Sequence, residues 1–355
     1  MRIRKAGESC LSHLASGKNH LEAAHLGKVV SVRCVSKAAF HYVSNEAAIR
    51  TRARGVEPKT RFASLKKLVL HKVSGTPSGA VAVQEHEADP DTWQALLDSA
   101  VKAVDDRTDF SQFDFVVAAG FGGTDLEHSF AHTSVPGTGI LADGIRLHHL
   151  VYLGSWFEGT ESAAEAMIHE LGHLFGLPDL YSYADRGERA SFKYVGGWDP
   201  MSVKLPGRTF LAWHQHKLGF LRDGELACLR EGRREVVLAP VAATHARGLK
   251  AVQIVISPSR SYVVEVRARV GLDDGVCRPG VLVYLVDATV RTGSGPIEVK
   301  GSEDLDEPYP CLALSDATLG LATGQETGFE AAAHGVVVRV LGQVGAGYRV
   351  AISKA

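Results

Sequence analysis

Hydrophobic residues recur in the first half of the chain at spacings that predict helices alternating with strands. The run 89–105 begins with an Asp-Pro pair suited to a helix start. One face of this helix is apolar and consists of Trp93, Leu96, Leu97, Val101 and Val104. Short β-rich runs follow at residues 113–119 and 149–156. This alternation predicts a layered arrangement of helices and strands within residues 73–222.

The hydrophobic pattern changes after residue 222. Six runs rich in Val, Ile, Leu and Tyr follow one another, with Gly, Pro and Asp between them. They lie at residues 234–240, 249–256, 261–270, 280–288, 335–342 and 347–353. No helical period interrupts them apart from a brief Ala-rich stretch at 330–333. Residues 223–355 are therefore predicted to form a β-rich, antiparallel, sandwich-like subdomain, and the whole chain an α+β protein.

The overall composition indicates a globular protein. Of the 355 residues, 45% are hydrophobic and 22% are charged, which is ordinary for such proteins. No run approaches the roughly 18 consecutive apolar residues that a membrane-spanning helix needs, so no membrane partner is expected. The net charge of −1 gives no reason to expect nucleic acid as a partner.

Charge is distributed unevenly along the chain. Residues 1–72 contain 15 Lys and Arg against 4 Asp and Glu, and the rest of the chain contains 24 against 36. The first 30 residues lack the apolar segment of a secretory signal. A basic, acid-poor start is typical of a transit peptide, a pro-segment or a nucleic-acid-binding arm, and also arises from an upstream misread of the start codon. We predict that 1–72 is a basic leader or pro-segment, followed by domains at 73–222 and 223–355.

The most informative stretch is ESAAEAMIHELGHLFGLPDLY, residues 161–181. Its apolar residues predict a largely buried helix that ends at Gly176. His169 and His173 are four residues apart, so they lie one turn apart on the same face. This spacing lets two imidazoles bind one zinc ion at about 2.0–2.1 Å. Glu170 follows the first histidine and is placed to take a proton from a water molecule on the metal.

The residues after this helix favour a metal site over the alternative of two hydrogen-bonded core histidines. Gly176 permits a sharp turn with positive φ, and Pro178 then imposes an extended exit. A chain that doubles back there brings Asp179 under the metal as a third ligand. Three protein ligands and one water molecule are the composition of a catalytic zinc site. A gluzincin-type hydrolase would instead take Glu188, on a later helix, as its third ligand.

Met201 provides a further indication. It is one of only three methionines and follows the turn Gly-Gly-Trp-Asp-Pro at residues 196–200. The pattern HExxHxxGxx(H/D) followed by a methionine turn is that of the metzincin peptidases. The other interpretation of Met201 is an ordinary core side chain.

Several segments together resemble the immune inhibitor A family of metallopeptidases. They are HELGHLFGLPDLY at 169–181, GGWDPMS at 196–202 and LAWHQHKLGFL at 211–221. Residues 261–288 are also similar to that family, whose members carry a strand with Tyr, Glu and Arg and then a Gly-Val-Leu-Val-Tyr strand. The resemblance covers roughly residues 90–355. It implies a metzincin-like catalytic domain, with a mixed sheet, an active-site helix and a methionine turn, followed by the β-rich subdomain.

The same resemblance implies roles for individual residues. His169, His173 and Asp179 would bind zinc, Glu170 would be the catalytic base, and Met201 would lie beneath the metal. The family resemblance also implies secretion and an extracellular location. Residues 1–72 match no signal peptide or propeptide of that family.

The function expected from the sequence is therefore that of a zinc-dependent endopeptidase acting on protein or peptide substrates. A strand bordering the cleft would align the substrate, and residues 149–156 are the expected strand. The alternative is a non-catalytic binding module that retains the fold. Acidic loops at 271–275 and 302–307 offer oxygen ligands for calcium, but neither has an EF-hand pattern, which favours solvated loops. The oligomeric state is not predicted.

The remaining polar residues have structural interpretations as well as chemical ones. His214 and His216 are two apart, so on a helix they point in different directions, which favours surface or packing roles. Tyr181 is expected either to lean towards the substrate or to pack as an ordinary side chain. Cys277 and Cys311 lie in the same late region and would suit a disulfide, whereas the alternative is that all five cysteines are free thiols.

Overall fold

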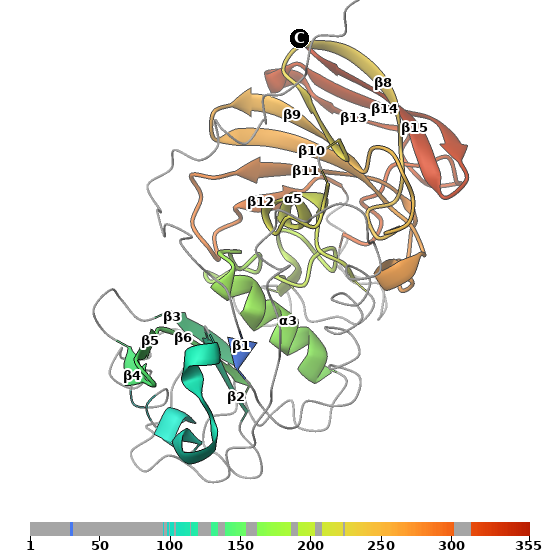
Figure 1. The fold of residues 1–355 in the computed structure, drawn as a ribbon. Helices are drawn as coiled ribbons and strands as arrows, with labels where there is room; N and C mark the ends of the chain where they lie inside the picture. The colour runs from blue at the N-terminus through green and yellow to red at the C-terminus, as the bar shows by residue number, and fades with distance from the viewer. Residues whose placement is uncertain are drawn as a thin grey trace, which may run out of the picture. The chain divides into compact units, whose positions relative to one another are not determined.

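The computed structural model describes residues 29–30, 95, 98, 100–102, 104–113, 115–119, 129–133, 139–153, 162–185, 191–202, 208–222, 224–301 and 314–355 (Figure 1). They divide into two compact units. The N-terminal unit holds the described residues up to Leu177, and the C-terminal unit holds those from Pro178 to Ala355. The domain boundaries expected from the sequence, after residues 72 and 222, do not coincide with this division.

A mixed sheet forms the centre of the N-terminal unit. Its described strands have the order β1 (Val29–Val30), β2 (Phe115–Ala119), β6 (His149–Leu153) and β3 (Phe130–Thr133). β2 is parallel to both β1 and β6, whereas β3 is antiparallel to β6. The strands predicted at 113–119 and 149–156 are confirmed as β2 and β6. β1 belongs to the segment predicted to be a leader, so part of that segment adds a strand to this sheet.

The predicted helix at 89–105 is confirmed where the structure describes it, because residues 95, 98 and 100–102 are helical. Its apolar face meets the sheet in one core that includes Val101, Val104, Phe110, Leu147 and Leu150. Two 3₁₀ turns, η3 (Asp105–Arg107) and η4 (Phe110–Gln112), lead from this helix into β2. β4 (Ile140–Ala142) and β5 (Ile145–Leu147) form a separate hairpin.

Helix α3 (Ser162–Leu174) packs against β6 and β3. Most of the described side chains in its second half are buried, including Met167, Ile168 and Leu174. The helix contains no β-branched run, and its Ala, Met, Leu and Glu residues are good helix formers. A helix of this length is stabilised mainly by burial of its apolar surface against the sheet, and less by the intrinsic helix propensity of its residues.

The C-terminal unit is built from two sheets, as the strand-like runs after residue 222 predict. In one sheet the order is β12 (Ile297–Val299), β11 (Gly280–Asp287), β10 (Arg260–Arg267), β9 (Ala251–Ser257) and β7 (Leu226–Leu229). In the other the order is β13 (Gly328–Ala331), β14 (Val336–Val344), β15 (Gly347–Lys354) and β8 (Gly232–Leu238). All pairings are antiparallel except that of β7 with β9. The described part of this unit also contains the short helices α5 (Ala212–Lys217), η6 (Gly271–Asp273) and η7 (Ala332–His334).

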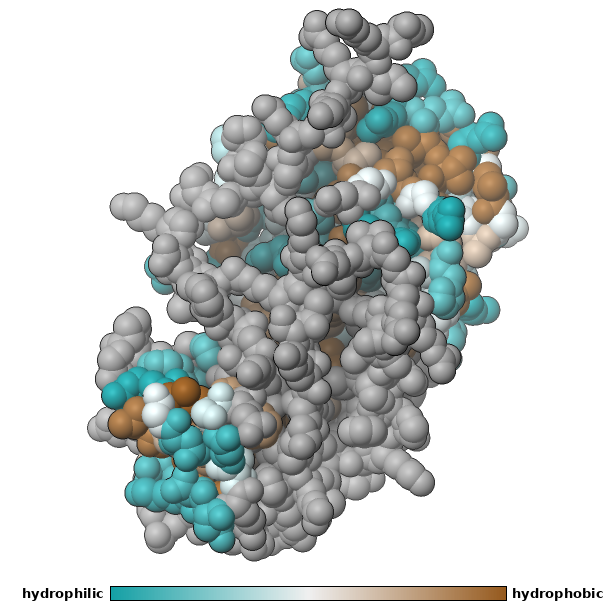
Figure 2. Space-filling model, viewed as in Figure 1, coloured by the Kyte–Doolittle hydropathy of each residue, from teal (hydrophilic) through white to brown (hydrophobic). Residues whose placement is uncertain are grey.

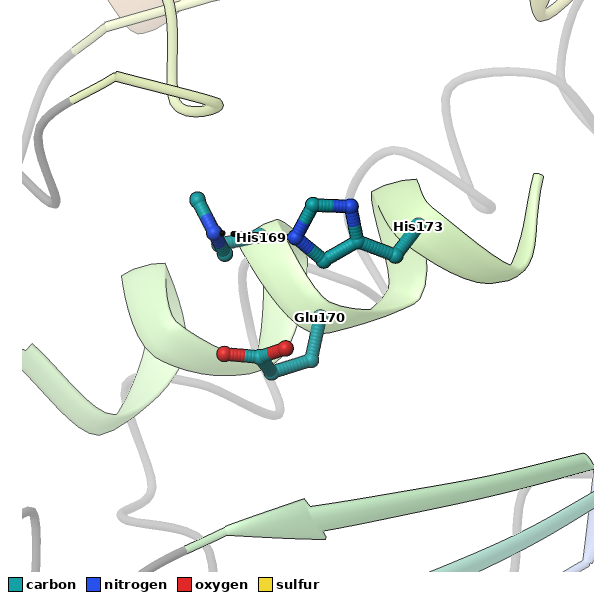
Figure 3. A group of neighbouring side chains, drawn as sticks. All are labelled: His169, Glu170 and His173. Atoms are coloured by element: carbon teal, nitrogen blue, oxygen red, sulfur yellow. Dashed lines mark hydrogen bonds between the residues drawn. The ribbon is translucent and has the colours of Figure 1, made fainter. Parts of the chain in front are cut away.

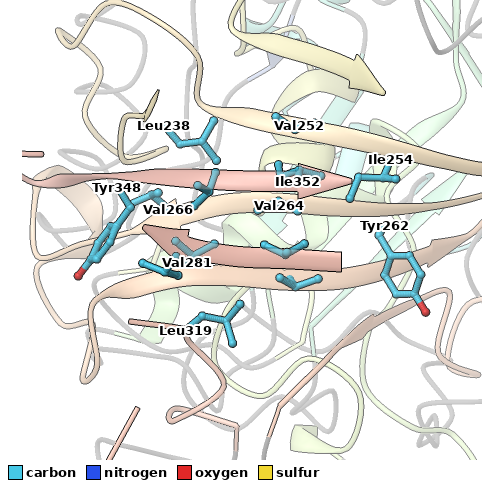
Figure 4. Close-up of a cluster of buried hydrophobic side chains, with 14 of the residues drawn as sticks. Leu238, Val252, Ile254, Tyr262, Val264, Val266, Val281, Leu319, Tyr348 and Ile352 are labelled. Carbon is cyan, nitrogen blue, oxygen red and sulfur yellow. The ribbon is translucent and has the colours of Figure 1, made fainter. Parts of the chain in front are cut away.

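One hydrophobic core joins these two sheets (Figure 4). Alternate residues along each strand enter it, because successive side chains of a strand point to opposite faces. The contributing side chains include Val252 and Ile254 from β9, Val264 and Val266 from β10, and Val338, Val350 and Ile352 from β14 and β15. The region is strand-rich, as predicted, and its two sheets share one core.

The described chain is thus a strand-rich α+β protein, as predicted.

In Figure 2 the face of the C-terminal unit near β14 and β15 carries hydrophobic residues among hydrophilic ones. Exposed apolar side chains of this unit include Val237, Leu341 and Val344. None of the helices among the described residues has the length and apolarity to cross a membrane.

Candidate metal centre

His169 and His173 form a close pair on α3, as their spacing predicts. Their Nε2 atoms are 3.2 Å apart, and their rings are nearly perpendicular, with an interplanar angle of 89° (Figure 3). His169 is only 2% exposed, and His173 is partly buried. The helix itself accounts for the pairing, because residues four apart project from the same face.

The C-terminal turn of α3 orients His173. Gly176 has a φ of 80° and donates its N–H to the His173 carbonyl at 2.9 Å, while the Leu177 N–H donates to the Gly172 carbonyl at 3.0 Å. These two bonds form a Schellman motif, so the helix stop predicted at Gly176 is confirmed. The reversed chain places the Leu177 carbonyl oxygen 2.9 Å from His173 Nδ1. Because that oxygen only accepts, Nδ1 is the nitrogen that donates to it, and in a neutral ring this leaves the lone pair on Nε2, the nitrogen that faces His169.

Glu170 completes a compact group. The potential ligand atoms of His169, Glu170 and His173 all lie within 4.8 Å of one another. Figure 3 shows the two imidazoles on one side of α3 and the Glu170 carboxylate on another. Its side chain is 3% exposed, so the carboxylate is held in a largely water-free environment. In the described part of the chain, this is the one cluster of His, Cys, Asp or Glu that gathers three such atoms.

The separation of the two Nε2 atoms can be compared with that of two ligands on one metal ion. Two nitrogens that each lie about 2.0–2.1 Å from one tetrahedral zinc ion are about 3.3 Å apart. The observed Nε2–Nε2 distance of 3.2 Å matches this separation. The bond from His173 Nδ1 to a backbone carbonyl is also the contact that a zinc-ligating histidine usually makes through its other ring nitrogen.

Asp179 lies in the C-terminal unit and is 5% exposed. Its Oδ2 accepts a short hydrogen bond from the Tyr183 hydroxyl, and its backbone N–H donates to Thr292 Oγ1 at 2.9 Å. Burial, and then the negative charge of Asp179, raise the pKa of the Tyr183 phenol well above its ordinary value. The phenol is therefore a proton donor to the carboxylate at every physiological pH. The role of Asp179 as third ligand stays a prediction.

Met201 is fully buried, and Asp199 holds the turn that carries it. Asp199 accepts hydrogen bonds from the Met201 N–H at 2.8 Å, the Leu211 N–H at 2.8 Å and His214 Nδ1 at 2.9 Å. The Met201 carbonyl in turn accepts the Leu180 N–H at 2.8 Å. The methionine turn and the segment that follows Pro178 are thus joined directly within the C-terminal unit.

Arg267 of β10 supports the same turn from the sandwich. Its side chain is 0% exposed and donates to the carbonyls of Trp198 at 3.0 Å and Thr209 at 3.1 Å. It also pairs with Asp273 at 2.8 Å and Glu265 at 3.2 Å. Burial lowers the pKa of Arg267, but the charges of Asp273 and Glu265 more than offset this effect and raise it. Arg267 is therefore a permanent buried cation between the sandwich and the turn.

Glu265 extends this buried network to α5. Its Oε2 accepts the Ala212 N–H at 2.7 Å and the Tyr284 hydroxyl at 2.8 Å. Burial raises the pKa of the Glu265 carboxyl, and burial followed by the charge of Glu265 raises that of the Tyr284 phenol. Sequence reasoning assigned no role to Glu265, Arg267 or Asp199. The sequence does contain an indication of a role for Glu265 and Arg267. Both lie inside an otherwise apolar strand, where a buried charge requires a partner.

The other predicted residues have mixed outcomes. His214 is fully buried and pairs with Asp199, which confirms a packing role. Asp273, in the loop considered for calcium, instead bonds Arg267 and the Thr209 N–H. Glu188 and the second acidic loop at 302–307 lie outside the described residues. Tyr181, for which a substrate contact or ordinary packing was predicted, lies 5.5 Å from Tyr183 between ring centroids, and it is Tyr183 that bonds the Asp179 carboxylate.

Cys228 and Cys277 are both disulfide-bonded. The alternative in which all five cysteines are free thiols is therefore wrong for these two. Cys10, Cys34 and Cys311 lie outside the described residues, so the predicted pairing of Cys277 with Cys311 stays a prediction.

Neither the known protein-family models nor the curated proteins include a match to this chain. The resemblance to the immune inhibitor A family therefore rests on the motifs given above.

Proposed function

We propose that this protein is a zinc-dependent peptidase of the metzincin type, with His169, His173 and Asp179 as ligands and Glu170 as the general base. The observation that carries the proposal is the 3.2 Å approach of the two histidine Nε2 atoms beside a buried carboxylate. The Schellman turn supports it, because it sets the tautomer of His173 that a metal ligand requires.

The chemistry assigned to the chain follows from these positions. Zinc, when bound, supplies a Lewis acid that makes water a nucleophile at neutral pH and polarises the scissile carbonyl. Glu170 accepts the proton of the attacking water and passes it to the leaving amine.

The sheet topology changes the expected substrate strand. β6, expected at 149–156 to align the substrate, is paired with β2 on one side and β3 on the other, so that expectation is wrong. Among the described strands, β3 lies at the edge of the sheet and packs against α3. We propose that an extended peptide pairs with β3 at this edge, next to the helix that carries Glu170.

An extracellular location is also proposed. The disulfide-bonded state of Cys228 and Cys277 supports it, because structural disulfides form and persist in oxidising compartments. Mass analysis of the natural protein, alkylated with and without prior reduction, tests this. Free thiols at both positions in the natural protein would contradict it.

The test of the activity uses two glutamates of α3. Glu170→Gln is expected to retain zinc and to lower peptide hydrolysis about 10²–10⁴-fold, because it removes the general base. Glu165→Gln, the same change earlier on the helix, is expected to keep both zinc and activity. The measurements are zinc content by elemental analysis and cleavage of casein and fluorogenic peptides, with and without a chelator.

Two results would reject the proposal. Full turnover by Glu170→Gln at equal zinc content would remove the general base from the mechanism. Zinc binding by the wild type with no cleavage of any peptide library would instead favour the non-catalytic binding module.

A further inference from the structure

The turn between β11 and β12 is bonded to the segment that carries Asp179. Gly293 donates its N–H to the Asp179 carbonyl at 3.1 Å, and its own carbonyl accepts the Tyr183 N–H at 2.9 Å. Thr292 Oγ1 accepts the Asp179 N–H at 2.9 Å and lies 3.5 Å from Asp179 Oδ2. The main chain of Asp179 is therefore bonded on both sides to a turn that lies 113 residues away in the sequence.

The Tyr183 ring packs closely against this turn. Gly293 has a positive φ of 69°, and a Cβ atom at this position would overlap the Tyr183 ring. Glycine is therefore required both by the backbone conformation and by the close approach of the aromatic ring. The ring in turn directs its hydroxyl to Asp179 Oδ2. Two hydroxyl groups, from Tyr183 and Thr292, thus approach the same carboxylate oxygen.

We propose that Tyr183 and Thr292 are positioning residues that orient the Asp179 carboxylate for zinc. This inference rests on the proposed function, since it takes Asp179 as the third ligand. Metal-binding carboxylates are usually held by hydrogen bonds from a surrounding layer of residues, which restrict their rotation before the metal arrives. Here both donors act on Oδ2, so the plane of the carboxylate is set by protein contacts.

The proposal assigns a direct role to the β-rich region. The turn between β11 and β12 supplies Thr292, and it supplies Gly293, which leaves room for the Tyr183 ring. This part of the β-rich region therefore shapes the surroundings of Asp179, which lies earlier in the chain. Partners in this layer typically contribute 10–100-fold to metal affinity. Loss of either hydroxyl should weaken zinc binding while leaving the His169–His173 pair, which α3 forms by itself, unchanged.

The experiment measures the zinc dissociation constant of purified full-length protein by competition with a chromogenic chelator. Tyr183→Phe and Thr292→Val are each expected to weaken zinc binding about 10–100-fold. Thr292→Ser retains the hydroxyl and should restore nearly wild-type affinity. Thr289→Val is the matched control in the same turn, because its hydroxyl bonds Asp287 instead of Asp179, and Tyr348→Phe is the control for loss of a phenol within the sandwich core.

A second measurement separates positioning from a general loss of structure. The zinc-free melting temperature should fall somewhat in Thr292→Val, because the Asp179 N–H loses its acceptor, and should change little in Thr289→Val. The zinc-induced increase in melting temperature should in addition become smaller in Thr292→Val and stay unchanged in Thr289→Val. A lower zinc-free melting temperature of Thr292→Val with an unchanged zinc-induced increase and unchanged zinc affinity would show a purely structural role and overturn the proposal.

The remaining outcomes distinguish this inference from the proposed function. If Asp179→Asn abolishes zinc binding while Tyr183→Phe and Thr292→Val bind zinc as the wild type does, Asp179 is a ligand and the positioning role is wrong. If Asp179→Asn binds zinc normally while His173→Ala does not, Asp179 is not the third ligand. The positioning role of Tyr183 and Thr292 is then wrong as well. Wild-type protein that binds no zinc would overturn both the inference and the proposed function.

Discussion

The helix that carries His169, Glu170 and His173 and the loops that carry Asp179 and Met201 are stabilised by contacts of different range. On α3 the three side chains lie within five consecutive residues, and the turn that orients His173 ends four residues later at Leu177. Asp179 is bonded to Thr292, 113 residues away, and the carbonyl of Trp198 is bonded to Arg267, 69 residues away. The local group depends on helix geometry, whereas the second group depends on the assembled sandwich.

This difference has a consequence for mutations. A substitution in α3 or its terminal turn should affect zinc ligation with a limited effect on the rest of the chain. A substitution in the buried network of the sandwich should affect the folding of the whole C-terminal unit, because its ions have no water to replace a lost partner. Four experiments separate the two behaviours.

The largest effect is expected from Arg267→Met. The change removes the cation that bonds Glu265 and Asp273, both fully buried, and leaves Asp273 only the more distant charge of Arg208. Loss of one partner of a buried ion pair typically costs about 3–5 kcal/mol, which should appear as a lower free energy of unfolding in urea. Arg349→Met is the control, because Arg349 and Glu235 are both about half exposed and 3.9 Å apart, and it should cost less than about 1 kcal/mol. Equal losses in the two variants would refute the role of the buried network.

Gly176→Ala tests the local group. Gly176 has a φ of 80° with open space around the missing Cβ, so the substitution strains the backbone without a clash. A left-handed conformation costs an L-residue about 1–2 kcal/mol, and relief of that strain should displace Leu177 and weaken the orientation of His173. We expect reduced stability together with reduced zinc affinity.

Gly144→Ala is a matched control for this substitution. Gly144 lies in the same unit with a φ of 78° and equally open space. The Gly144→Ala protein should therefore lose about as much stability as the Gly176→Ala protein but keep the zinc affinity of the wild type, as measured by chelator competition. Equal zinc affinity in both variants would show that the turn after α3 does not orient a ligand.

Tyr284→Phe tests the buried network through pH. Burial, and then the charge of Glu265, raise the Tyr284 pKa well above 10, so the folded protein keeps a proton that the unfolded chain loses near pH 10. The unfolding free energy should therefore fall as pH rises above about 10, by up to about 1.4 kcal/mol per pH unit for this group.

The phenylalanine variant should be less stable at neutral pH, since Glu265 and the Trp213 N–H lose a partner, but its stability should fall less steeply above pH 10. Urea denaturation from pH 8 to 11 measures both quantities. Identical slopes for the two proteins would mean that Tyr284 ionises in the folded state as it does in the unfolded chain.

Deletion of residues 1–72 should have the smallest effect on zinc. The deletion removes β1, which pairs only with β2 among the described strands, and leaves β6 and β3, against which α3 packs. A chain that starts at residue 73 should therefore bind zinc with full stoichiometry and melt at a somewhat lower temperature. Loss of zinc, or insoluble protein where the full chain is soluble, would show that β1 is essential to the unit.

The local elements of this protein were open to prediction because they depend on neighbouring residues. Helix α3 (Ser162–Leu174), its stop at Gly176 and the pairing of His169 with His173 follow from the 3.6-residue period and the conformational freedom of glycine. The strands of the β-rich half follow equally from runs of β-branched residues between Gly, Pro and Asp. In each case the information lies within a few residues.

The tertiary structure decided the features that depend on long-range pairing. Strand order made β6 an internal strand and β3 the edge, and it brought Val29 and Val30 into the sheet, because no local pattern specifies which strands become neighbours. The same holds for the hydrogen bonds that the Asp179 N–H donates to Thr292, that the Tyr183 hydroxyl donates to Asp179, and that Arg267 donates to the Met201 turn. A buried charge in a strand indicates that a partner must exist, and only the assembled sandwich identifies that partner.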